Sequence, residues 1–181
     1  MKRRHEFVPS FHLSEALRRV ALDYALMLPI AAAHELSAVA ALMRATIEPL
    51  AYYNARAITA ELTKYTEDTL RARVERDAQA VLVTRDDDGI TGFCVSRFDD
   101  GTIWLDWFGV AARARGRGVG AALLRALQAT LPSRDAHKIW CDSRTDNIES
   151  RAVLERAGFR RIATLANHWY HQDYFLWEWY P

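Results

Sequence analysis

The chain has 181 residues, is 50% hydrophobic and carries a formal net charge of +1. This size and composition suit a globular domain with a hydrophobic core. A near-neutral charge gives no overall attraction to nucleic acid or to a membrane surface, so neither is expected as a partner. Two cysteines do not make a disulfide framework, and we expect Cys94 and Cys141 to be buried thiols in a reduced cytoplasm.

Residues 1–28 are predicted to form an N-terminal helical extension, followed by one domain over residues 29–181. Apolar residues recur at helical spacing from Leu13 to Met27, and Pro29 ends the helix. Basic residues before an apolar stretch are typical of a signal peptide, but charged residues at positions 6, 18, 19 and 23 interrupt this one. With no apolar run of about 18 residues, we expect a cytoplasmic protein that does not enter the membrane.

The first half of the domain is predicted to contain helices followed by an antiparallel meander. A short strand is expected at residues 30–33, followed by an amphipathic helix at 36–47. Asn54 and Thr66 are candidate N-caps of two further helices. Asp-Gly pairs at 88–89 and 100–101 mark tight turns between three strands, at 80–84, 90–98 and 102–110.

The second half alternates helices and strands. A helix leaves the glycine-rich segment near residue 118 and ends before Pro132. A strand at 138–142, a helix from Asn147 to Gly158, and strands at 159–165 and about 170–179 follow. This order predicts an α/β protein of the α+β type, with a mixed sheet and helices on both faces.

The segment Arg115-Gly116-Arg117-Gly118-Val119-Gly120 lies between a predicted strand and a predicted helix. A helix N-terminus presents unpaired backbone N–H groups and the positive end of the helix dipole, so it favours an anion. Glycines allow a phosphate to approach the backbone closely, and the two arginines add charged donors. The segment therefore predicts a diphosphate site.

The sequence supports two other interpretations of this segment less well. Gly116-x-Gly118-x-x-Ala121 fits a loose dinucleotide-binding fingerprint, but five residues separate Val110 from the first glycine and too little chain follows for such a sheet. Arginine–glycine patches that bind RNA are longer, repetitive and disordered, whereas this segment lies within regular periodicity.

Two spaced motifs in this order resemble the GNAT superfamily of CoA-dependent N-acetyltransferases. Residues 115–120 match the family's Arg/Gln-x-x-Gly-x-Gly/Ala pattern, and Trp107-Phe108-Gly109-Val110 is similar to the strand end that precedes it. Asn147 followed by a helix ending in Ala157-Gly158-Phe159 is similar to the second hallmark. The resemblance covers about residues 30–181. It implies a mostly antiparallel, twisted sheet that splays between the family's fourth and fifth strands.

The resemblance also implies acetyl-CoA as the co-substrate and no metal. The pantetheine arm would lie along the strand end, and the pyrophosphate would lie on the N–H groups of the glycine turn. The side chain of Asn147 would contact CoA or a bound water. The residues implied in CoA binding are Phe108, Gly109, Val110, Arg115, Gly116, Arg117, Gly118, Val119, Gly120, Ala121 and Asn147.

Acetylation of an amine requires a proton acceptor, because a free alkyl amine is protonated at neutral pH. Strand alternation predicts that Trp104, Asp106, Phe108 and Val110 share one face. Asp106 is the ionisable group among them, and it is our candidate base or ammonium anchor; a structural carboxylate is the alternative.

The family's usual general acid is a tyrosine four residues before the glycine of the Gly-Phe pair, and Leu154 occupies that position here. We expect Tyr174 to take the role. Tyr170, Ser143 and Ser150 are alternatives, as is departure of the thiolate without an acid.

Tyr52 and Tyr53 lie in the loop that forms the acceptor lid in the family, and Tyr170 lies in an aromatic segment near the C-terminus. All three are predicted to bind substrate, although the segment at 167–177 equally fits a hairpin packed on the core or a homodimer surface. Glu48 and Glu61 either attract a cationic amine or are solvated surface charges.

The predicted function is acetyl transfer from acetyl-CoA to a primary amine of a small molecule or peptide. Transfer from a longer acyl-CoA and a non-catalytic CoA-binding sensor or interaction module are the alternatives.

Overall fold

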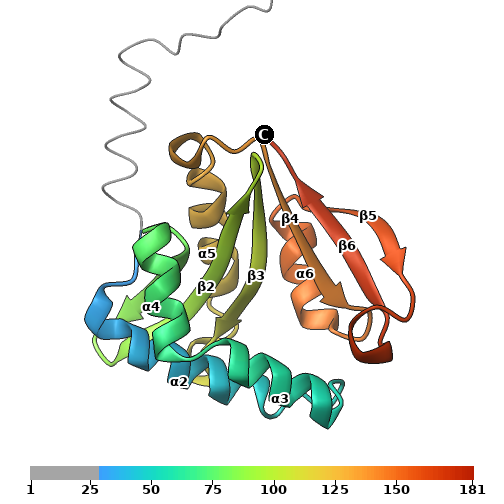
Figure 1. Ribbon diagram of the computed structural model, residues 1–181, viewed down its shortest axis with the longest axis horizontal. Helices are drawn as coiled ribbons and strands as arrows, with labels where there is room; N and C mark the ends of the chain where they lie inside the picture. The colour runs from blue at the N-terminus through green and yellow to red at the C-terminus, as the bar shows by residue number, and fades with distance from the viewer. Residues whose placement is uncertain (1–28) are drawn as a thin grey trace, which may run out of the picture.

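The computed structural model describes residues 29–181, so the helix predicted at residues 1–28 lies outside the described chain. A six-stranded mixed sheet forms the centre, with the strand order β1-β2-β3-β4-β6-β5. Figure 1 shows the strands fanning out as two groups that separate between β3 and β4. The mixed sheet with helices on both faces is confirmed.

The first three strands form the predicted antiparallel meander. They are β1 (Val81–Asp86), β2 (Gly89–Asp99) and β3 (Thr102–Val110). The turns use positive φ angles of 108° at Gly89 and 72° at Gly101, which explains the Asp-Gly pairs. The strand expected at 30–33 is wrong: Ile30 makes only an isolated bridge to Leu82, because a 3-10 turn, η1 (Ala33–Glu35), begins three residues later.

The second group contains β4 (Lys138–Arg144), β5 (Arg160–Leu165) and β6 (Tyr174–Trp179). Strand β6 lies between the other two and is antiparallel to both. It begins at Tyr174 instead of residue 170, because residues 166–173 form a loop that includes the 3-10 turn η4 (Trp169–His171). Asn167, Tyr170 and His171 in this loop have φ angles of 51°, 51° and 61°, values incompatible with a strand.

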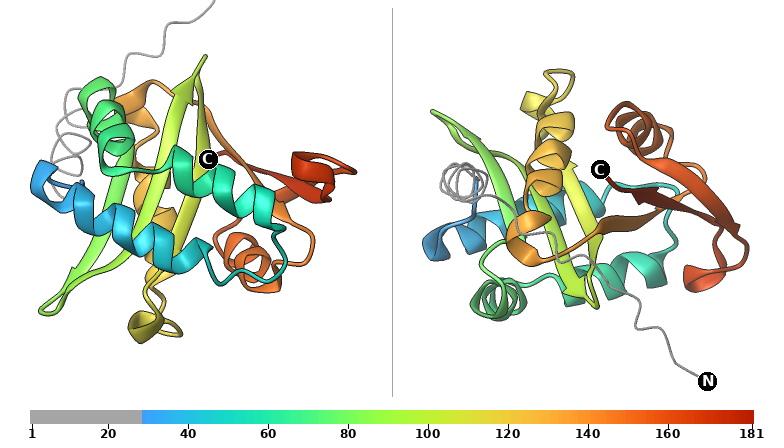
Figure 2. Two further views of the ribbon diagram at one scale, coloured as in Figure 1. Left: turned by 60° about the horizontal axis from the view of Figure 1, so that its bottom comes forward. Right: turned by 90° about the horizontal axis from the view of Figure 1, so that it is seen from above.

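Helices α2 (Leu36–Ile47), α3 (Ala55–Lys64) and α4 (Glu67–Arg76) lie on one side of the sheet. Helices α5 (Val119–Ala129) and α6 (Ile148–Arg156) lie on the other, as the view from above in Figure 2 shows. Both predicted N-caps are confirmed: the side chain of Asn54 accepts from Ala57 N at 2.9 Å, and that of Thr66 accepts from Thr69 N at 3.3 Å.

Each face of the sheet has its own hydrophobic core. Leu123, Leu124 and Leu127 of α5 pack with β-strand residues on one side, and Val39, Met43 and Ile47 of α2 pack on the other. A fully buried side chain of this size stabilises the fold by roughly 1.5–3 kcal/mol. Cys94 and Cys141 are buried and free, as expected.

Strands β3 and β4 pair only at their beginnings. Residues 102–105 of β3 are in parallel register with residues 138–141 of β4, and no pairing continues beyond Leu105 and Cys141. The remaining parts of the two strands diverge, which leaves one edge of each without a neighbouring strand. A cavity lies in the space between the diverging strands.

Candidate active site

A cavity of about 1120 Å³ occupies the opening between β3 and β4. Its wall includes the diverging ends of both strands, the glycine turn, the N-terminus of α6, helix α3, the loop before α3 and the loop before β6. The cavity therefore connects segments from residue 46 to residue 174.

The glycine turn forms one end of the cavity. Gly116 and Gly118 have φ angles of 73° and 80°, and a Cβ atom added to either would meet nothing within 4 Å. Gly118 is the N-cap of α5, and the backbone N–H of Ala122 donates to its carbonyl at 3.0 Å. Helix geometry leaves the N–H groups before Ala122 without an intrahelical acceptor, so the turn has the open space and free donors that a diphosphate needs.

Most residues predicted to bind CoA border this cavity. Arg117 is exposed and does not belong to the wall. Gly120 lies close to α6 and to β3, since an added Cβ would be 3.4 Å from Val153 and 3.7 Å from Val110. The predicted CoA-binding residues in the wall are Phe108, Gly109, Val110, Arg115, Gly116, Gly118, Val119, Gly120, Ala121 and Asn147.

The free edge of β3 faces the gap. The N–H of Ala111 donates to the Thr91 carbonyl at 2.8 Å, so its backbone groups point toward β2. Backbone groups alternate in direction along a strand, and those of Phe108 and Val110 consequently point away from β2. These are the groups available to hydrogen-bond an extended ligand arm.

Asn147 has a structural role as well as a position in the wall. Its Oδ1 accepts from Ser150 N at 3.0 Å and caps α6. The side-chain amide N–H groups remain for a ligand or a water molecule.

The prediction that four alternate residues of β3 share one face is wrong. Val95 pairs with Trp107 and Ser96 with Leu105, which leaves Asp106 as the extra residue of a β-bulge. Beyond the bulge, Phe108 packs with the core on the α5 side, and Val110 lies next to Gly120 of α5. Asp106 lies on the opposite face, where it meets Arg73 of α4.

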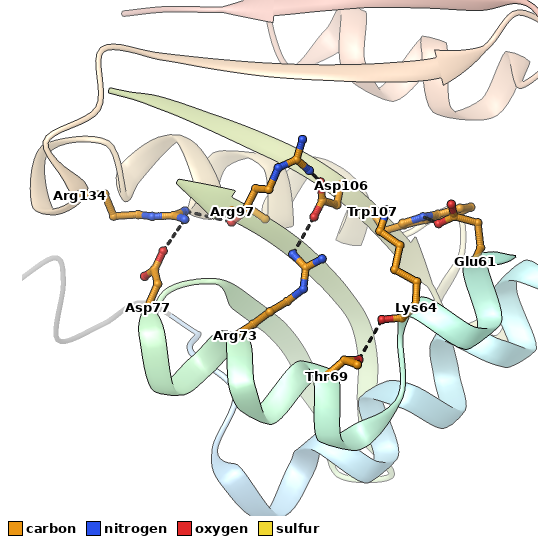
Figure 3. Close-up of polar contacts among 10 residues, drawn as sticks. Glu61, Lys64, Thr69, Arg73, Asp77, Arg97, Asp106, Trp107 and Arg134 are labelled. Atoms are coloured by element: carbon orange, nitrogen blue, oxygen red, sulfur yellow. Dashed lines mark hydrogen bonds and ion pairs between the residues drawn. The ribbon is translucent and has the colours of Figure 1, made fainter. Parts of the chain in front are cut away.

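Two arginines hold Asp106. The Arg73 guanidinium donates to its carboxylate at 2.7 Å, and the Arg97 guanidinium donates to the other oxygen. Only 4% of the Asp106 side chain is exposed. Figure 3 shows both guanidinium groups directed at this carboxylate. Such an environment is typical of a structural ion pair, and the catalytic role of Asp106 stays a prediction.

Asp142 is a second carboxylate at the point where the strands separate. It follows Cys141, the last residue of β4 paired with β3, and it borders the cavity. Burial raises the pKa of this carboxyl group above its usual value, and His168 Nε2 lies 3.9 Å from its Oδ2. Asp142 is not among the residues predicted from the sequence, because its position at the cavity depends on where β4 separates from β3.

Tyr174 lies at the start of β6 and borders the cavity. Its side chain is buried, and burial raises its pKa to about 12. Burial and the neighbouring Tyr174 also raise the pKa of Tyr53. Both phenols therefore keep their protons at neutral pH. Leu154 is 1% exposed and packs in the core.

The far end of the cavity lies under two tethered loops. Gln172 Nε2 donates to the Tyr52 carbonyl at 2.9 Å, and Asn54 Nδ2 donates to the Tyr170 carbonyl at 3.1 Å. These contacts join the loop before α3 to the loop before β6, across the opening of the sheet. Asn167, Tyr170 and His171 in the second loop have left-handed backbone conformations, which are strained for residues other than glycine.

The structure separates the predicted substrate residues. Tyr52, Tyr53 and Glu61 border the cavity, whereas Tyr170 is not part of its wall and lies under the Arg56 guanidinium at 5.6 Å. Glu48 pairs with Arg44 on the surface of α2. His168 and Trp169 border the cavity instead, at positions that sequence analysis did not select as substrate residues.

Comparison with known families matches residues 46–159 to the Acetyltransferase (GNAT) family. The chain belongs to this family. The match begins in α2 and ends after α6, so it contains both the glycine turn and the capping asparagine of this GNAT domain.

A curated relative is the mycothiol acetyltransferase of Kineococcus radiotolerans, with 33% identity over 108 residues. The alignment covers 58% of this chain but 35% of that protein, so the chain spans about a third of its relative's length. This GNAT domain and its relative therefore share one segment, and not the whole protein.

Solved structures confirm the fold. An N-acetyltransferase from Staphylococcus aureus Mu50 matches with a TM-score of 0.69 at 20% identity, over 85% of this chain and 97% of that one. A putative acetyltransferase from Salmonella typhimurium, solved with acetyl-CoA, matches with a TM-score of 0.68 at 18% identity, over 83% and 91%. Ard1 from Thermoplasma volcanium has a TM-score of 0.66 at 19% identity, over 83% and 94%.

In this GNAT domain the predicted separation of the family's fourth and fifth strands corresponds to β3 and β4. Among residues 29–181, no helix has the length and apolar character needed to cross a bilayer. The same residues contain no cluster of three or more metal-ligand side chains.

Proposed function

We propose that the protein transfers an acetyl group from acetyl-CoA to a primary amine of a small molecule or peptide. The observation that carries the proposal is the single cavity that joins the free N–H groups of the glycine turn to Asp142 and Tyr174. This arrangement supplies an anion site at one end and groups able to accept and donate protons at the other.

The donor end would bind acetyl-CoA through backbone groups. The N–H groups around Gly118 would hold the pyrophosphate, and the free edge of β3 at Phe108 and Val110 would pair with the pantetheine arm. A backbone N–H on the same edge would stabilise the negative charge that develops on the thioester oxygen. The acetyl-CoA in the Salmonella structure supports this choice of donor.

At the acceptor end, Asp142 would remove the proton from the ammonium group. The nitrogen lone pair then forms the bond to the thioester carbonyl carbon, and the carbon–sulfur bond breaks. Tyr174 would donate its proton to the departing sulfur, either directly or through water, and its phenolate would take up the second proton, which the nitrogen loses as the amide forms. We assign the base to Asp142 instead of Asp106, because the two arginines on Asp106 stabilise its charged form and oppose protonation.

A thiol-release assay with acetyl-CoA and a panel of primary amines tests this function. We expect release that depends on both the amine and the enzyme, with slower release from longer acyl-CoA donors.

A CoA-binding sensor is the second candidate, since Leu154 occupies the position of the family's usual acid. If calorimetry shows CoA binding while no amine releases thiol, the sensor replaces the enzyme.

A further inference from the structure

Lys64, the last residue of α3, borders the cavity. Its ammonium group is 5.1 Å from the Tyr65 ring centroid and 5.5 Å from that of Trp169. It forms no ion pair with any carboxylate in residues 29–181. Lys64 is therefore a cation placed over aromatic rings from two separate elements, with donors left for a ligand.

Arg97 also borders the cavity. Its guanidinium lies 5.1 Å from the Trp104 ring centroid and contacts Asp106. Because Arg73 also binds this carboxylate, two guanidinium groups share one negative charge, which leaves a net positive charge beside the cavity. Figure 3 shows Lys64 and Arg97 on opposite sides of Asp106 and its Arg73 partner. A carboxylate on the acceptor would complete the charge balance.

Two carboxylates also border the cavity, and one of them, Glu61, lies three residues before Lys64 on α3. Glu61 Oε2 accepts from the indole Nε1 of Trp107 at 2.7 Å, which fixes that carboxylate and leaves its second oxygen available. Asp142 lies beside His168, and His168 contacts Trp169, the residue under Lys64. Charges of opposite sign thus line one cavity, and a polyamine would meet two repelling cations there.

We propose that the acceptor is an amino acid, whose carboxylate binds Lys64 and Arg97 while its amine faces Asp142 and Glu61. This proposal rests on the proposed acetyl transfer and specifies its acceptor. It accounts for the opposite charges in the cavity, and the surrounding tryptophan and tyrosine rings provide room for an apolar side chain.

The test compares related acceptors in the thiol-release assay. The twenty standard L-amino acids are measured first, and the best is compared with its carboxamide, its decarboxylated amine and phosphoethanolamine. We expect kcat/KM for the amino acid to exceed that for the carboxamide by about 10- to 100-fold, because the carboxamide lacks the charge that the two cations bind.

Variants at Lys64 separate recognition of the carboxylate from catalysis. Lys64→Met is expected to lower kcat/KM for the amino acid about 10- to 100-fold while changing that for the carboxamide less than about twofold, and Lys64→Arg is expected to restore most of the loss. Lys138→Gln is the matched control, since Lys138 pairs with Glu178 outside the cavity.

Equal rates for the amino acid and its carboxamide, or equal losses for both in Lys64→Met, would overturn the amino-acid assignment and leave acetyl transfer standing. Faster reaction of phosphoethanolamine would replace the carboxylate by a phosphate. Absence of release with every acceptor would overturn both proposals together.

Discussion

The two ends of the cavity are built in different ways. The donor end consists of backbone N–H groups from one short segment, the glycine turn and the first turn of α5. The acceptor end consists of side chains from α3, β2, β3, β4 and the loop before β6, and these elements span more than 100 residues of the chain. Backbone recognition fixes the ligand class, whereas side-chain recognition can change between relatives without altering the fold.

At the acceptor end, Asp142→Asn is expected to lower kcat/KM about 100- to 1,000-fold through loss of the proton acceptor. Burial raises the pKa of Asp142, so wild-type kcat/KM should fall as the pH decreases through that raised value. A pH–rate profile should show this limb in the wild type and not in the variant.

Asp106→Asn is the matched control. It leaves two arginines without their carboxylate and is expected to lower the free energy of unfolding by about 1–3 kcal/mol while the acidic limb persists. Loss of the limb in Asp106→Asn, and its retention in Asp142→Asn, would reverse the assignment of the base.

At the donor end, Gly118→Val is expected to weaken acetyl-CoA binding about 100-fold, because a side chain at this left-handed position blocks several charge-assisted N–H contacts. Isothermal titration calorimetry measures the change. Gly89→Val is the control, since Gly89 also has a positive φ but lies in the β1–β2 turn outside the cavity wall. Equal affinities in both variants would argue against the glycine turn as the anion site.

Tyr174→Phe tests whether the Tyr174 hydroxyl protonates the departing sulfur. We expect kcat to fall about 10-fold with unchanged acetyl-CoA affinity, because the hydroxyl acts on the departing sulfur and Tyr53 lies nearby to take over part of the role. Tyr180→Phe, at an exposed tyrosine outside the cavity, should have wild-type kcat. An unchanged kcat in Tyr174→Phe would favour departure of the thiolate without this acid.

Glu35 lies outside the cavity wall, so its substitution should change the stability of the fold without changing catalysis. Glu35 accepts hydrogen bonds from Arg85 and from Ala32 N, and the Arg85 contact is the main reason that its pKa falls to about 2. The resulting stabilisation is present above the ordinary pKa of 4.5 and disappears as the pH falls toward 2. Glu35→Gln should lower the free energy of unfolding at pH 7 by about 1–2 kcal/mol, a value reduced by the exposure of Arg85.

Urea unfolding of the wild type and Glu35→Gln at pH 7 and near pH 2 measures this difference. It should vanish at the lower pH while kcat at pH 7 stays unchanged. A difference that persists near pH 2 would show that the ion pair is not its source.

Local signals in the sequence predicted the mixed sheet and most of its helices, and they selected a glycine turn that borders the cavity. Asn54 and Thr66 marked helix starts, and the glycine turn and Asn147 lie on the cavity as their motifs required. The face of β3 was not predictable by alternation, because a β-bulge depends on the register with β2 and has no local signature here.

The acceptor end was harder to predict for the same physical reason. Asp142 borders the cavity only because β4 lies parallel to β3 and then diverges from it. His168 and Trp169 border the cavity and Tyr170 does not, because three residues of their loop have left-handed backbone conformations. Neither feature follows from the spacing of residues along the chain.

A crystal structure of the protein with CoA would show whether the gap between β3 and β4 joins the two ends of the cavity. We predict the pyrophosphate on the N–H groups around Gly118, the pantetheine along Phe108 and Val110, and the sulfur near the Tyr174 hydroxyl and Asp142. Pantetheine bound outside this gap, or a sulfur remote from both side chains, would contradict this prediction.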